Sequence, residues 1–120
     1  MKNRILIVDD YEDIHEIIPM IFSDENYIFS SALTASDLEA EISRFDPHLI
    51  IMDVLIGDYD GRKLCSELKS NPKYKDIKII LTSASIMNFM QHLCHPDDFI
   101  EKPFEIADMK AKVNQLLLGE

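Results

Sequence analysis

The chain has 120 residues, of which 47% are hydrophobic and 28% charged, as expected for one globular domain that can bury its own core. The formal charge of −10 argues against direct contact with nucleic acid or an anionic membrane, and no apolar run approaches the ~20 residues of a membrane span. Cys65 and Cys94 lack CxxC spacing and indicate free thiols in a reducing compartment. We therefore expect one cytoplasmic domain over residues 1–120, with no nucleic-acid or membrane partner.

The first elements alternate between short apolar runs and helical patterns. Ile5–Val8 predicts a buried strand, and residues 14–22 place an apolar stripe at helical spacing on a helix that continues past Pro19. His15 lies off this stripe and is expected to face solvent. Tyr27–Ala32 predicts a second strand, which is less apolar and so nearer an edge of the sheet.

The middle of the chain repeats the pattern. Ser36 and Glu39 have the spacing of a capping box, which predicts a helix that buries Leu38, Ile42 and Phe45. His48–Met52 predicts a third strand. Asp60-Gly61 then begins a helix that ends near Asn71-Pro72.

The remaining elements are two strands and a final helix. Ile77–Leu81 and Phe99–Glu101 predict the fourth and fifth strands. The last helix is expected to bury Ile106, Met109 and Val113, together with Leu116 or Leu117.

This alternation predicts an α/β fold with a parallel sheet, because each crossover is long enough to return the chain in the same direction. Strand order 2-1-3-4-5, that of a flavodoxin-like (βα)5 doubly wound sandwich, is the expected arrangement. In that order the first and third strands are neighbours, and ligands bind at the carboxyl ends of the strands where the order reverses.

Polar side chains follow four of the apolar runs. Asp9 and Asp10 follow the first, Asp53 the third, Thr82 the fourth and Lys102 the fifth. Each acid alone could simply begin a helix, but three acids at neighbouring strand ends repel one another unless a cation lies among them. Oxygen ligands favour Mg²⁺. We therefore expect a magnesium-assisted phosphate site in which Asp53 is the nucleophile, Thr82 donates a hydrogen bond and Lys102 neutralises phosphoryl charge.

The motifs ILIVDD, LIIMD, DG, KIILTS and DDFIEKPF, in this order, resemble the receiver domain of two-component response regulators over essentially the whole chain. The resemblance implies that Asp53 accepts a phosphoryl group from a phosphohistidine on a sensor kinase or a histidine phosphotransfer protein. It implies that Asp10, Asp53 and the backbone carbonyl of Leu55 bind Mg²⁺ directly, and that Asp9 acts mainly through a metal-bound water. No turnover of a separate substrate is expected.

The resemblance also implies a switch. Thr82 would move toward the phosphoryl group, and Phe99 would report that state to the surface formed by the segment at 86–95, the fifth strand and the last helix. That segment is rich in methionine and other apolar residues, which suggests a short or irregular helix suited to a partner or a homodimer, although these side chains could equally join the core.

Gly57 is among the departures from the family pattern, and two alternative functions remain. Gly57 stands where the family usually has proline, which gives the loop after Asp53 more freedom. One alternative is a phosphorylation-independent, receiver-like module that only binds other proteins. The other is an aspartyl-phosphate hydrolase of the haloacid dehalogenase type, which is disfavoured because Asp9-Asp10-Tyr11 lacks the Asp-x-Asp pair of that class.

Overall fold

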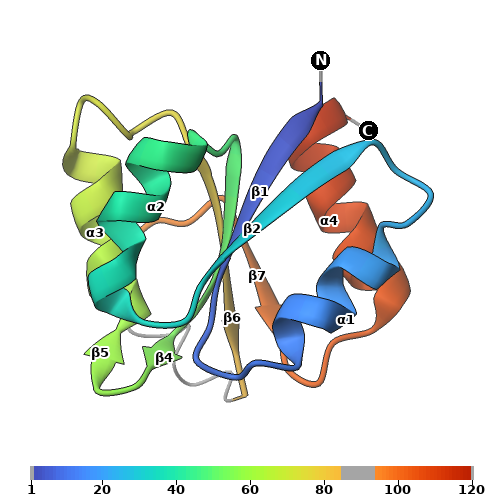
Figure 1. Cartoon of the computed structure of the whole chain (residues 1–120), viewed down its shortest axis with the longest axis horizontal. Coiled ribbons are helices and arrows are strands. Elements are labelled where there is room, and N and C mark those ends of the chain that lie inside the picture. The colour runs from blue at the N-terminus through green and yellow to red at the C-terminus, as the bar shows by residue number, and fades with distance from the viewer. Residues whose placement is uncertain (1, 85–93, 120) are drawn as a thin grey trace.

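The computed structural model describes residues 2–84 and 94–119. Within them, five parallel strands form one sheet with helices on both faces (Figure 1). The strands are β1 (Asn3–Val8), β2 (Tyr27–Ala32), β3 (Leu49–Asp53), β6 (Lys78–Ser83) and β7 (Asp98–Glu101). Their order is β2-β1-β3-β6-β7, which confirms the predicted order 2-1-3-4-5 and the flavodoxin-like fold class.

The helices cover the sheet in pairs. In Figure 1, α1 (Ile14–Ile21) and α4 (Ile106–Leu118) lie on one face, and α2 (Leu38–Phe45) and α3 (Gly61–Ser70) lie on the other. The two termini lie at the opposite edge from the carboxyl ends of the strands. None of the described helices is long and apolar enough to cross a membrane.

The unbroken apolar runs follow from this sandwich, because successive strand side chains point to opposite faces and both faces are covered. In β1, Ile5 and Ile7 join the core beneath α1 and α4, whereas Leu6 and Val8 join the core beneath α2 and α3. All four side chains are at most 1% exposed. The central strands are therefore buried on both faces, and polar groups can follow them where they end at the carboxyl edge.

The predicted capping box before α2 is wrong. A short 3-10 turn, η1 (Ala35–Asp37), precedes the helix, and the side chain of Thr34 accepts a hydrogen bond from the backbone N–H of Asp37 at 3.2 Å. Ser36 lies inside this turn, and its hydroxyl lies 3.0 Å from that of Thr34. Thr34 therefore caps the segment, because the cap is the residue that precedes the turn, and Ser36 lies within it.

Two apolar stripes are narrower than predicted. α1 continues past Pro19, as expected, but Ile17 is 43% exposed. In α4, Met109 and Val113 are buried, whereas Ile106 is 62% exposed, so its predicted burial is wrong. The physical reason is local: Phe104, just before the helix, packs against the core that Ile106 was expected to cover.

A small hairpin follows β3 that the strand pattern did not predict. β4 (Leu55–Ile56) pairs antiparallel with β5 (Tyr59–Asp60) across the turn Gly57-Asp58. Gly57 has φ of 59°, a left-handed conformation that glycine adopts at no steric cost. A Gly-Asp pair between two short runs is a known hairpin signal, so the sequence did contain the information.

The segment at 86–95 lies outside the described residues except for Cys94 and His95, so the short helix and apolar patch expected there are not described. Cys65 is buried, Cys94 is partly buried, and both are free thiols, as the sequence indicated.

Gly61, the first residue of α3, allows the helix to start against β3. Its N–H donates to the carbonyl of Val54 at 2.6 Å. A Cβ at this position would lie 2.1 Å from the backbone carbonyl oxygen of Asp53. A methyl group cannot fit there unless the backbone that carries Asp53 moves.

Gly61→Ala is therefore expected to destabilise the protein by roughly 1–3 kcal/mol, the usual cost of overpacking, even though the change favours a helix elsewhere. The free energy of unfolding in urea measures this effect. Ser70→Ala, at the exposed other end of α3, is the matched control and should be close to neutral. Equal stability of the Gly61→Ala variant and the wild type would contradict the close approach.

Candidate metal-binding site at the carboxyl edge of the sheet

Three aspartates meet where β1 and β3 end. The register pairs Val8 with Met52, so Asp9 and Asp53 leave the sheet side by side. Asp9, Asp10 and Asp53 each offer a carboxylate oxygen, and these oxygens lie within 4.8 Å of one another. The neighbourhood of the first and third strands, inferred from topology rules, thus brings the predicted acids together.

Lys102 lies against this cluster. It follows β7, and its backbone N–H donates to the carbonyl of Ser83 at 2.7 Å, which fixes the chain beside β6. Its ammonium Nζ donates to Asp9 Oδ2 at 2.7 Å and to Asp53 Oδ2 at 3.1 Å. A lysine that is distant in sequence from both aspartates therefore bridges two of the three carboxylates.

The charges of the cluster leave room for a divalent cation. Three carboxylates and one ammonium sum to −2 when all are ionised, and Asp9 is only 2% exposed, so water screens it poorly. Hard oxygen donors at this separation suit Mg²⁺. The residues present thus fit the ion that the sequence suggested.

The surroundings of Asp53 and Lys102 shift the pKa values of both groups. Burial raises the pKa of Asp53 above 3.8, the positive charge of Lys102 opposes this, and the negative charge of Asp9 adds to it. For Lys102, burial alone would lower the pKa, but the hydrogen bond and charge of Asp9, with the charge of Asp53, raise it overall. Lys102 is therefore a fixed positive charge, and the site resists the ionisation of Asp53.

Asp10 is held differently from the other two acids. Its side chain is exposed, and its Oδ2 accepts a hydrogen bond from the backbone N–H of Gly57 at 2.9 Å. Proline at position 57 could not make this bond, because proline has no N–H. The departure from the family pattern at Gly57 therefore ties the hairpin after Asp53 to the acidic cluster, an effect that the sequence did not reveal.

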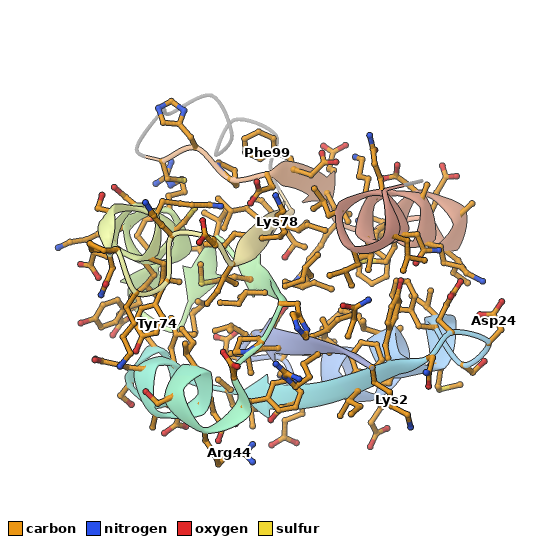
Figure 2. The ribbon with its side chains drawn as sticks, turned by 90° about the horizontal axis from the view of Figure 1, so that it is seen from above. Lys2, Asp24, Arg44, Tyr74, Lys78 and Phe99 are labelled. Atoms are coloured by element: carbon orange, nitrogen blue, oxygen red, sulfur yellow. The ribbon has the colours of Figure 1, made fainter. Side chains whose placement is uncertain are left out.

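The other predicted site residues border the cluster. Thr82 is 2% exposed and pairs with Asp53 in the register of β3 and β6. The backbone N–H of Leu55 lies 3.4 Å from Asp53 Oδ1, and its side chain is 61% exposed. Phe99 is 36% exposed and lies at the outer side of β7 (Figure 2). Thr82 thus lies beside Asp53, and Phe99 lies on the edge strand one position before Ile100, the partner of Thr82.

His15 does not face solvent as expected. It is partly buried, and its Nε2 lies 2.8 Å from the carbonyl oxygen of Asp9, so Nε2 must carry the proton of this hydrogen bond. Its Nδ1 is buried and has no hydrogen-bond partner among the described residues. The side chain of Asp9 also accepts from the N–H of Tyr11 at 2.9 Å. His15 and Tyr11 thus hold the backbone around Asp9. The pattern of apolar residues in the sequence did not indicate either contact.

A parallel α/β sheet with three aspartates and a lysine at the carboxyl ends of its strands is the arrangement that the sequence resemblance implied. Residues 5–114 match the response regulator receiver domain family. The chain therefore belongs to that family, and it is a receiver domain of the two-component response regulator type.

Two curated relatives are about twice as long as this chain. The DNA-binding dual master transcriptional regulator RpaA of Synechocystis sp. is 28% identical over 95% of this chain and 48% of its own length. The probable transcriptional regulator ycf27 of Cyanophora paradoxa is 32% identical over 97% of this chain and 48% of its own length. The chain thus spans about half the length of these relatives.

A solved structure shows the same fold. The signal receiver domain of a signal transduction histidine kinase from Syntrophus aciditrophicus is 32% identical, with a TM-score of 0.87 over 98% of this chain and 91% of that one.

These relatives correct the expected partners. The charge of −10 predicted that nucleic acid is not a partner, yet a relative that matches 95% of this chain is a DNA-binding regulator of transcription. The charge argument concerned only the surface of these 120 residues, whereas about half of that relative lies outside the match. The expectation that the protein has no direct nucleic-acid partner was therefore wrong.

Asp53→Asn should stabilise the protein at neutral pH without divalent cations. The raised pKa means that folding favours the protonated acid, so the wild type loses stability as pH rises from 3.8 through the higher folded pKa of Asp53. Asparagine cannot ionise, so its advantage in melting temperature should be full above that pKa and should shrink as pH falls. Thermal melts over a pH series with chelator measure this difference.

The control is Asp58→Asn, which removes an exposed carboxylate from the hairpin turn. It should show no comparable pH-dependent gain. A variant at Asp53 that is less stable than the wild type at neutral pH, and equally stable in acid, would show that Lys102 outweighs burial and would contradict this account.

Proposed function

We propose that this domain accepts a phosphoryl group on Asp53 from a phosphohistidine donor. The observation that carries the proposal is the bridging of Asp9 and Asp53 by Lys102 inside a cluster of three carboxylates. A structural ion pair would need one acid for one lysine. The surplus of negative charge is what a cation-assisted phosphate site requires before its ligands arrive.

Mg²⁺ would be held by Asp10, Asp53 and the backbone carbonyl of Leu55, with Asp9 acting mainly through a water. When bound, the ion supplies positive charge that allows phosphate oxygens to approach these carboxylates. The oxygen chemistry of the three aspartates, and their separation, support this assignment.

The transfer itself uses the chain's own side chains. A carboxylate oxygen of Asp53 attacks the phosphorus, the P–N bond of the phosphohistidine breaks, and the released imidazole nitrogen takes up a proton. The product is an acyl phosphate on Asp53. Lys102, already 3.1 Å from Asp53, supports the charge of the phosphoryl oxygens, and the hydroxyl of Thr82 donates to one of them. Because the phosphoryl group stays on Asp53, the domain is an acceptor and does not turn over a separate substrate.

The same residues would switch the surface. Thr82 is buried beside Asp53. On the adjacent strand β7, Thr82 pairs with Ile100, the residue after Phe99. A shift of Thr82 toward the phosphoryl group would leave space that changes the packing of the half-exposed Phe99. The state of Asp53 would then reach the surface of β7 and α4 as a population shift between two packings.

The output is proposed from the relatives. A domain that spans 48% of a DNA-binding transcriptional regulator would act as the receiver part of a longer regulator of transcription. Such a regulator would work in the cytoplasm.

Incubation with acetyl phosphate and Mg²⁺ should add the mass of one phosphoryl group to the wild-type protein and none to Asp53→Asn. Lys102→Ala should be phosphorylated more slowly, since a positive charge next to the acceptor is lost. Intact-mass spectrometry, with peptide mapping of the modified residue, measures both. Asp58→Asn, in the adjacent hairpin, is the control and should be modified like the wild type.

Absence of any mass gain in folded wild-type protein, with Mg²⁺ in excess, would favour the phosphorylation-independent interaction module. Modification at another residue would contradict the assignment of Asp53 as acceptor.

A further inference from the structure

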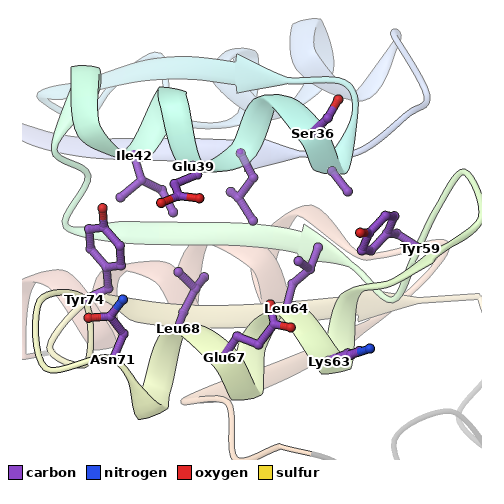
Figure 3. A pocket seen from close by; sticks show the side chains of 12 residues that line it. Ser36, Glu39, Ile42, Tyr59, Lys63, Leu64, Glu67, Leu68, Asn71 and Tyr74 are labelled. Carbon is purple, nitrogen blue, oxygen red and sulfur yellow. The ribbon is translucent and has the colours of Figure 1, made fainter.

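A groove between α2 and α3 lies on the face of the sheet away from α1 and α4 (Figure 3). Its volume is about 360 Å³. Four apolar side chains from the two helices form its floor, namely Leu38, Ile42, Leu64 and Leu68. The lining includes none of the three aspartates of the acidic cluster and neither Thr82 nor Lys102, so the groove is separate from the phosphoryl-acceptor site.

The rim of the groove is acidic. Figure 3 shows Glu39 on α2 and Glu67 on α3 projecting beside the apolar floor. Both side chains are exposed, and neither forms a hydrogen bond or ion pair with another residue that the structure describes. Lys63, one turn before Glu67, also lies on the rim and makes no ion pair with a described residue. Two unpaired carboxylates thus stand over an apolar floor, with a single positive charge beside them.

Aromatic side chains lie at the two ends of the groove. Tyr59, from the hairpin, is 54% exposed at one end, and Tyr74, which is buried, lies at the other (Figure 3). A volume near 360 Å³ lies at the lower limit for a small-molecule pocket, and it suits one or two large side chains better than a cofactor. The acidic rim would repel phosphorylated ligands and nucleic acid.

We propose that this groove is a docking site for a cationic, amphipathic segment of a partner protein. Such a segment would insert apolar side chains between the helices and place lysine or arginine against Glu39 and Glu67. Charge complementarity selects this occupant, because its basic residues would pair carboxylates that are otherwise unpaired. A groove between two helices is also the usual receptor for an amphipathic helix. This docking site is independent of phosphorylation and goes beyond the proposed function.

The test uses the unphosphorylated chain and three synthetic helical peptides. The first has leucine on one face and lysine on the other, the second has serine in place of leucine, and the third has glutamate in place of lysine. Backbone amide shifts in NMR titrations locate and quantify binding. Only the leucine–lysine peptide should bind, and its shifts should fall on α2, α3 and the hairpin. Equal binding of the serine–lysine peptide, or shifts centred on α1 and α4, would overturn the proposal.

Paired variants separate the groove from the general charge of the protein. Glu39→Gln with Glu67→Gln should weaken the leucine–lysine peptide roughly three- to tenfold, as expected for two solvent-exposed ion pairs. Glu16→Gln with Glu105→Gln removes the same charge from the opposite face and should change affinity by less than about twofold. Equal weakening by both pairs would reduce the interaction to non-specific attraction and overturn the proposal. Tryptamine that binds the groove as tightly as the peptide would also overturn it, since the occupant would then be a small organic cation.

Discussion

Repulsion among carboxylates is the constraint on which this domain depends. At an effective dielectric constant near 20, two charges 4.8 Å apart repel by about 3 kcal/mol, and the switch point holds three such groups. Lys102 offsets part of this repulsion by contacting Asp9 and Asp53 together. In the proposed function, the remaining excess of negative charge would attract a divalent cation, and the cation would in turn allow a phosphoryl group to approach. A sheet packed on both faces is what keeps these groups together against their mutual repulsion.

Two glycines give the backbone around Asp53 its shape. Gly61 lets α3 start against the carbonyl of Asp53, and Gly57 turns the hairpin so that its amide reaches Asp10. In both cases the absence of a side chain, or of a proline ring, decides the contact. A backbone N–H thus connects the loop after the proposed acceptor to the acidic cluster. Changes of other side chains in the loop would leave this hydrogen bond in place.

Much of this could be predicted from the sequence, for an identifiable reason. A parallel sheet covered on both faces requires unbroken apolar strands, and strand ends such as Asp9, Asp53 and Lys102 then converge by topology alone. Features that depend on single contacts could not be predicted in this way. The cap by Thr34 in place of Ser36, and the packing of Phe104 in place of Ile106, each depend on which of two nearby side chains makes a single contact.

The neighbourhood of His15 illustrates the same limit. The helical spacing of apolar residues placed His15 off the apolar stripe of the helix. That spacing carries no information on the loop after β1, which contains Asp9. The carbonyl of Asp9 lies within hydrogen-bond distance only after β1 and α1 have packed. The expected absence of a nucleic-acid partner failed for a different reason, because composition describes a domain and not the longer regulators in which its relatives occur.

The most direct test of the central claim is a titration of the unphosphorylated protein with Mn²⁺ as a paramagnetic substitute for Mg²⁺, followed by the broadening of backbone amide signals. The account predicts that low Mn²⁺ concentrations broaden signals around residues 9, 10 and 53–57, that excess Mg²⁺ reverses the broadening, and that Asp10→Asn weakens it. No broadening at the carboxyl ends of β1 and β3, or stronger broadening at Glu39 and Glu67, would contradict the claim that the acidic cluster is built to hold a divalent cation.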